Sequence, residues 1–125
     1  MIDLNILYNT DQESIIIDDT YELPKEYIID DRIKSLSKIK VNGEISLVKD
    51  EDLEDKVYIN AKIEGTMNIE DSITLKIIPY KFNIEYDDYV EEIYQNNQNK
   101  LDIFAFLWEN IELEVPIRYT LEEND

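Results

Sequence analysis

The stretch LDIFAFLWENIELEVPIRY, residues 101–119, decides how the rest of the chain is expected to fold. Its first half has the period of a helix, because apolar residues recur at spacings of three and four along one face. These residues are Leu101, Phe104, Ala105, Trp108 and Ile111. Asp102 is the expected N-cap, since its carboxylate can accept from the free N–H groups of the first turn. Pro116 disfavours helix just beyond Val115, so the stretch predicts a strongly apolar helix over 102–112.

Alternating apolar and polar residues predict long strands before this helix. Residues 37–48 and 57–69 alternate strictly, and a short polar segment joins them, which is typical of an antiparallel hairpin. Residues 14–23 are rich in β-branched side chains and form a further expected strand. Residues 73–87 form the third long strand, and its apolar register shifts by one near residues 78–79, so we expect a bulge there.

These elements predict an α+β fold. We expect mainly antiparallel β-structure, as a curved sheet or open barrel of long strands packed on one C-terminal apolar helix. The 125 residues suit a single domain spanning 1–125, and residues 1–12 and 121–125 are expected to be mobile.

Composition narrows the possible chemistry. The chain has neither Cys nor His, so the usual zinc ligands and the imidazole base of Ser-His and Cys-His catalysis are missing. Its two glycines cannot build a phosphate-binding glycine loop. We therefore expect no cofactor, no metal and no catalytic residues, although carboxylate chemistry stays open. The sequence has no stretch of about 20 apolar residues and no basic leader, so the cytoplasm is the expected location.

Net charge is the second strong feature. Thirty acidic and 12 basic residues give −18, which disfavours binding of free nucleic acid and favours basic proteins as partners. The alternative is an acidic composition that serves solubility and has no specific partner.

The C-terminal stretch resembles the end of the YceD family, bacterial and plastid proteins associated with accumulation of large-subunit ribosomal RNA. That family has an Asp-capped apolar helix carrying a Glu and followed by Leu-x-x-Pro. Residues 62–67, KIEGTM, are similar to the family's central strand. The matching positions here are Asp102, Glu109, Leu113 and Pro116 at the end, and Thr74, Leu75, Tyr80 and Phe82 in the strand after 62–67. The resemblance covers about half the chain.

Three positions depart from the family pattern. The usual cysteine position holds Asp71, the following arginine position holds Ile73, and the strand proline position holds Lys81. The chain is thus similar to a divergent member that lacks the family cysteine. At Asp71 itself, a turn-capping role is the interpretation we favour.

The resemblance implies a ribosome-biogenesis factor that supports accumulation of 23S ribosomal RNA. With the charge, it suggests a non-enzymatic protein that binds a basic large-subunit ribosomal protein or a precursor particle and contacts RNA only indirectly, without a membrane or small-molecule substrate. The alternative is an acidic protein-interaction or adaptor domain unrelated to ribosomes.

Candidate contact residues fall into three groups. An acidic segment is either a solvated hairpin tip or a docking loop for a basic protein: Asp50, Glu51, Asp52, Glu54 and Asp55. A basic segment either touches RNA or protects an exposed strand edge: Arg32, Lys34, Lys38 and Lys40. On the helix, Phe106, Trp108 and Glu109 are candidates for partner binding, although we favour core positions for the aromatic residues there.

Tyrosines gather in the second half of the chain. Tyr80, Tyr86, Tyr89 and Tyr94 are compatible with stacking on nucleic-acid bases. Because Lys81 is the single basic residue among them, too few for an RNA-binding surface, we favour strand-surface and core positions for these rings.

Overall fold

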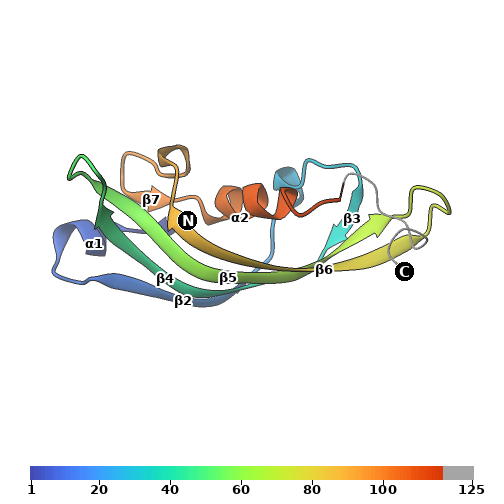
Figure 1. Ribbon diagram of the computed structural model, residues 1–125, viewed down its shortest axis with the longest axis horizontal. Coiled ribbons are helices and arrows are strands. Elements are labelled where there is room, and N and C mark those ends of the chain that lie inside the picture. The colour runs from blue at the N-terminus through green and yellow to red at the C-terminus, as the bar shows by residue number, and fades with distance from the viewer. Residues whose placement is uncertain (117–125) are drawn as a thin grey trace.

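The computed structural model describes residues 1–116, and a long curved antiparallel sheet dominates it (Figure 1). The main strands are β2 (Ser14–Tyr21), β4 (Ile39–Lys49), β5 (Asp55–Glu70) and β6 (Ile77–Tyr89). β5 is central: β4 and the short β3 (Ile33–Leu36) pair along one side of it, and β6 pairs along the other. β2 extends the sheet beyond β4. The predicted α+β fold is confirmed, as a curved sheet whose described strands do not close into a barrel.

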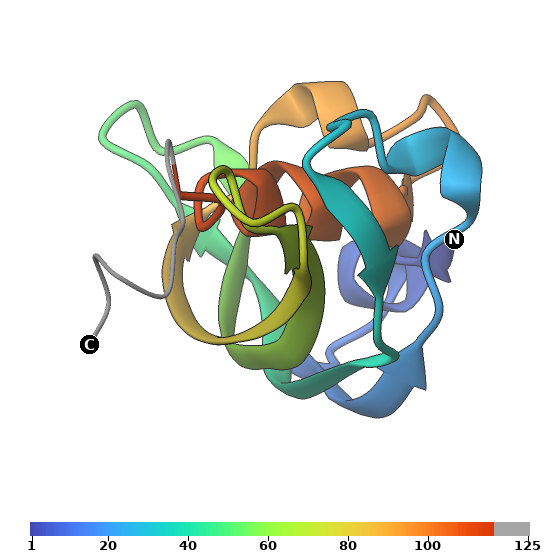
Figure 2. The same cartoon turned by 90° about the vertical axis from the view of Figure 1, so that its right-hand side faces the viewer.

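The helix α2 (Ile103–Glu112) lies along the concave side of this sheet (Figures 1 and 2). Its predicted cap is present, because the Oδ1 atom of Asp102 accepts from the backbone N–H of Ala105 at 3.2 Å. Helix residues Phe106, Leu107 and Ile111 are fully buried. Each such side chain stabilises the fold by about 1.5–3 kcal/mol relative to an exposed position.

Apolar side chains alternate with polar ones along β4 and β5, and the apolar ones form the sheet side of the core. Val41 is opposite Ile63, and Ile45 is opposite Ile59, so buried residues face each other across the two strands. The alternation predicted for residues 57–69 places one set of β5 side chains in the core, and all of these are buried: Val57, Ile59, Ala61, Ile63, Met67 and Ile69.

Two inward-facing glycines lie on these curved strands. Gly43 is opposite Ala61, and a Cβ atom on Gly43 would be 2.1 Å from the carbonyl oxygen of Asn60. Gly65 is opposite Phe82, whose ring tip would be 2.7 Å from a Cβ atom on Gly65. The first position allows close approach of two backbones, whereas the second receives an aromatic ring.

The predicted bulge near residues 78–79 is wrong. β6 begins at Ile77, not at residue 73, and it pairs with β5 without a register shift up to Tyr89. Residues 72–74 form a turn before β6, where the buried carboxylate of Asp71 accepts from the N–H groups of Ile73 and Thr74 at 2.7 and 3.0 Å. This confirms Asp71 as a turn cap. The apolar side chains that suggested an earlier strand start are exposed: Ile73, Leu75 and Ile77.

The N-terminal segment, predicted to be mobile, is instead part of the fold. β1 (Ile2–Asp3) pairs with β7 (Lys100–Leu101), and α1 (Asn5–Asn9) follows. Leu4 is 0% exposed, and its N–H donates to the carbonyl oxygen of Asn99 at 2.8 Å. Burial of Leu4 and Leu7 beside the end of the sheet outweighs the weak pattern of this segment. The predicted mobile residues 121–125 lie outside the described residues.

Two single-turn 3₁₀ helices complete the structure. η1 (Lys25–Tyr27) precedes β3, and η2 (Glu92–Tyr94) follows β6. Both neighbour α2, so the segment after β6 is held against the helix.

Substituting the glycines should separate their two roles. Gly43→Ala should lower the free energy of unfolding by about 3 kcal/mol, because the new methyl group meets backbone atoms of β5 that cannot move alone. Gly65→Ala should cost about 1 kcal/mol or less, since the Phe82 ring can tilt away. Urea unfolding followed by circular dichroism measures both, and equal costs would contradict the assigned roles.

Trp108 offers a second stability test. Trp108→Ala should lower the free energy of unfolding by about 3–5 kcal/mol, because the ring is only 6% exposed. Its Nε1 atom has no hydrogen-bond partner within residues 1–116. Trp108→Phe should therefore cost well under half as much as Trp108→Ala, since it removes the unpaired N–H while keeping an aromatic ring. A similar cost for both variants would show that Nε1 is paired in solution.

Candidate partner-binding site

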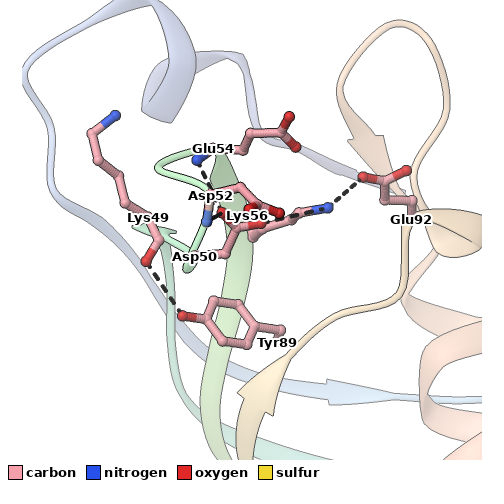
Figure 3. Close-up of polar contacts among 7 residues, drawn as sticks. All are labelled: Lys49, Asp50, Asp52, Glu54, Lys56, Tyr89 and Glu92. Carbon is pink, nitrogen blue, oxygen red and sulfur yellow. Dashed lines mark hydrogen bonds and ion pairs between the residues drawn. The ribbon is translucent and has the colours of Figure 1, made fainter.

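The acidic segment forms the turn between β4 and β5, and one of its carboxylates holds that turn together. Oδ1 of Asp50 accepts from the N–H groups of Asp52 and Glu54 at 2.9 and 3.0 Å (Figure 3). Between them, Leu53 has a left-handed backbone (φ 60°) and an exposed side chain. Of the predicted residues, Asp50 is structural, and the others remain exposed: Glu51, Asp52, Glu54 and Asp55. We call residues 50–55 the acidic turn.

Lys56 connects the acidic turn to η2. Its Nζ atom is 2.9 Å from Oε1 of Glu92 and 4.0 Å from Oδ2 of Asp50 (Figure 3). The hydrogen bond to Glu92, followed by the charge of that carboxylate, raises the pKa of Lys56. Nearby, the Tyr89 hydroxyl donates to the carbonyl oxygen of Lys49 at 3.4 Å. One cation thus lies between carboxylates from two separate segments.

A cleft of about 530 Å³ opens beside Lys56, between the end of β6, η2 and α2. Its lining combines aromatic rings with acidic side chains, and we call it the tyrosine cleft. The aromatic residues are Tyr86, Tyr89, Tyr94 and Phe106, and the carboxylates are Asp50, Asp88, Glu91, Glu92 and Glu109. Within the part of the chain that the structure describes, Lys56 contributes the one ammonium group of the lining.

The rings of the tyrosine cleft are fixed by contacts among themselves. Tyr86 meets Phe106 edge to face, with centroids 4.8 Å apart, and Tyr94 meets the same ring at 6.3 Å. The Tyr86 hydroxyl donates to the carbonyl oxygen of Tyr89 at 2.5 Å, and the Tyr94 hydroxyl donates to the carboxylate of Glu109. These bonds occupy both hydroxyl protons and hold the rings in place.

The electrostatic environment of the cleft is negative. Burial is the largest cause that raises the pKa of Tyr86, and the charges of Asp88, Glu109 and Glu91 raise it further. Burial and the hydrogen bond to Glu109 raise the pKa of Tyr94 in the same way. The carboxylates therefore act together on groups at the floor of the cleft, and they would favour any cation placed there.

A second hollow of about 310 Å³ adjoins the first. The two share Lys56, Val90 and Glu92 in their linings. The second hollow is polar, because the loop after η2 lines it with amide side chains: Gln95, Asn96 and Asn97. The ion pair between Lys56 and Glu92 thus lies where the two hollows meet.

The aromatic residues of the helix lie in the core, as favoured from the sequence, and do not form the exposed partner-binding patch that was the alternative. Phe106 is 2% exposed and Trp108 is 6% exposed, because α2 lies inside the curve of the sheet and is covered on more than one side. Phe106 still contributes to the floor of the tyrosine cleft. Glu109, the third candidate on the helix, lines the cleft as well.

The basic segment is partly engaged within the protein. Arg32 forms a fork with Asp30, at 3.0 and 2.6 Å, and its Nη1 atom donates to the carbonyl oxygen of Pro116 at 2.8 Å. Lys34 is 3.6 Å from a carboxylate oxygen of Glu70. Lys38 and Lys40 are exposed. The segment therefore presents less free positive charge than its sequence suggests.

Sequence reasoning missed the tyrosine cleft as a site. It treated Tyr86, Tyr89 and Tyr94 separately from the acidic residues. The available signal was the alternation of acidic and aromatic residues in DDYVEEIY, residues 87–94. This pattern indicates a cleft only when α2 is known to lie against the segment.

Comparison with known proteins adds no identification, because no protein-family profile, curated protein or solved structure matches the chain. Within residues 1–116, no helix is long and apolar enough to cross a membrane. In the same part of the chain, no group of three or more potential ligands is arranged to hold a metal ion.

Raising the pH should test the Tyr94–Glu109 contact. The pKa of Tyr94 is raised in the folded protein above its ordinary value of 10.0, so the unfolded chain ionises first. The corresponding stability is present below that value and is lost as the pH rises above it towards the folded pKa. Tyr94→Phe should flatten this loss in chemical unfolding measured across the alkaline range. Glu109→Gln should flatten it partly, and an unchanged slope in Tyr94→Phe would contradict the assignment.

Proposed function

We propose that this protein is a non-enzymatic binding protein for a basic protein partner in the cytoplasm. The observation that carries the proposal is the meeting of the acidic turn and the tyrosine cleft at one end of the molecule, joined by Lys56. Among residues 1–116, five carboxylates and one ammonium group line the cleft, and four further carboxylates of the turn are exposed beside it.

Electrostatic attraction and contact with the aromatic rings would contribute differently to such binding. A surface with net charge −18 attracts basic partners at a distance and speeds their encounter. The attraction acts over about 8 Å at physiological ionic strength, so short-range contacts must supply specificity. The ordered rings of the tyrosine cleft offer such contacts at little cost in conformational entropy, because they are already held in place.

We further propose that the partner is a basic large-subunit ribosomal protein or a precursor particle, and that binding supports accumulation of 23S ribosomal RNA. The support for this step is the resemblance to the YceD family in residues 62–67 and in the C-terminal pattern of Asp102, Glu109 and Pro116. At the family's cysteine position, Asp71 caps a turn in this protein. RNA would be contacted only indirectly, since the acidic surface repels phosphate.

The second candidate function is an acidic adaptor domain with no ribosomal role. The observation that favours it is the cleft itself, whose chemistry suits basic segments of many proteins. Affinity purification at low salt, with proteins and RNA both identified, separates the two functions. Enrichment of large-subunit components supports the ribosomal role, and their absence beside another basic protein supports the adaptor role.

Direct titration tests the preference for protein over RNA. At matched salt, the purified protein should bind a basic large-subunit ribosomal protein more tightly than it binds naked 23S ribosomal RNA. Binding should weaken as salt rises, because screening reduces attraction between exposed charges. The triple variant Glu51→Gln, Asp52→Asn, Glu54→Gln removes charge and leaves the turn-holding Asp50 in place. It should weaken the complex.

The basic segment provides the control. Reversing the charges of Lys34, Lys38 and Lys40 should leave binding of the ribosomal protein intact. Tight RNA binding that needs no ribosomal protein, and that these reversals abolish, would contradict the proposed function.

A further inference from the structure

Lys56 lies at the one place in the tyrosine cleft where a partner's cation would be expected. We propose that the cleft binds an arginine side chain of a basic partner, and that Lys56 occupies the position of that side chain in the free protein. This inference rests on the proposed function, and it names the chemical group that the site recognises and the internal residue that competes for it.

Negative charge is in excess around Lys56. Its ammonium group has Glu92 at 2.9 Å and Asp50 at 4.0 Å, whereas Asp88, Glu91 and Glu109 lie in the same lining. Lys56 is the one cation that residues 1–116 place in this lining, and it leaves most of these carboxylates uncompensated. Self-repulsion among them destabilises the free protein, and a second cation would relieve it.

Lys56 is held loosely enough for a partner's cation to displace it. The Glu92 side chain in this ion pair is 80% exposed, and the Lys56 side chain is 29% exposed. Ion pairs that water reaches in this way contribute little to stability. Lys56 can therefore move into solvent while a partner's cation takes its place, and little stability is lost.

The lining of the cleft favours an arginine side chain over a lysine side chain as the bound group. The hydroxyl groups of Tyr86 and Tyr94 are already engaged, so their ring faces and edges are what the cleft offers a ligand. A planar guanidinium stacks on aromatic rings and binds a carboxylate through two parallel hydrogen bonds. A lysine ammonium is more strongly hydrated and lacks that planar fork.

The adjoining polar hollow extends the site. Lys56, Val90 and Glu92 lie between the two hollows, and movement of the Lys56 side chain would open one into the other. The amides of Gln95, Asn96 and Asn97 then offer donors and acceptors to the backbone of a partner segment. With about 530 Å³ in the first hollow, an arginine side chain fits together with part of its backbone.

The probe for the experiment is a short glycine-serine peptide that carries a few spaced arginines, compared with the same peptide carrying lysines. Calorimetric titration at low salt measures both affinities. The arginine peptide should bind about threefold more tightly than the lysine peptide, because of stacking on the tyrosine rings. Equal affinities would overturn the assignment of arginine.

Matched variants test the two parts of the site. Lys56→Gln should tighten binding of the arginine peptide by about threefold, since a competing exposed ion pair is lost. The control Lys62→Gln removes the same charge from a lysine that is outside the cleft lining and 60% exposed, and it should have a much smaller effect. Unchanged or weaker binding by Lys56→Gln, relative to this control, would overturn the role of Lys56.

A second pair of variants locates the peptide. The double variant Asp88→Asn, Glu91→Gln removes two cleft carboxylates and should weaken binding by about tenfold. The control Asp18→Asn, Asp19→Asn removes two exposed charges from β2 and should change binding far less. Equal weakening by both pairs would show that net charge alone attracts the peptide and would overturn the cleft as the site. Circular dichroism checks that every variant is folded.

The outcomes separate this inference from the proposed function. If the peptide binds through the cleft but the purification enriches no ribosomal components, the arginine site is supported and the ribosomal role is contradicted. If a ribosomal protein still binds the cleft variants but no longer binds the acidic-turn variants, the proposed function is supported and the arginine site is overturned.

Discussion

Burial of α2 in the concave side of the sheet is the interaction on which the rest of this structure depends. The sheet presents an apolar inner face through residues such as Ile45, Ile59 and Ile63, and a curved face of this kind cannot remain in water. The helix covers it with Phe106, Leu107 and Ile111. Curvature and helix therefore require each other: a flatter sheet would leave the helix exposed, and without the helix the inner face would be exposed.

The same packing builds the tyrosine cleft. Phe106 belongs to the core, yet its ring also contacts Tyr86 and Tyr94, which line the cleft. The helix brings Glu109 to the Tyr94 hydroxyl, although the two residues are 15 positions apart. A ligand in the cleft would therefore touch rings that are supported by the core, and such support limits the entropy lost on binding.

Charge at this end of the molecule opposes stability while it favours binding of cations. Carboxylates gathered around the cleft and the acidic turn repel one another, and the ion pairs of Lys56 offset this only in part. The arrangement is consistent with a surface that is completed by a basic partner. In contrast, Arg32 and Lys34 in the basic segment are paired within the protein, so they are less available to phosphate groups.

The sequence by itself determined the features that depend on near neighbours along the chain. The cap at Asp102, the helix over 103–112, the hairpin of β4 and β5 and the turn at Asp71 all follow from local periodicity and local hydrogen bonds. The start of β6 was misplaced because Ile73 and Leu75 have strand-like spacing, although the Asp71 turn holds them outside the sheet.

Only the tertiary structure decided what depends on distant residues. The burial of Leu4 and Phe106 follows from what packs over them, which no local pattern records. The tyrosine cleft forms where β6, η2 and α2 meet, and the pairing of Lys56 with Glu92 joins residues 36 positions apart. Periodicity fixes which face of an element is apolar, whereas the side chains that meet across that face depend on how the whole chain closes on itself.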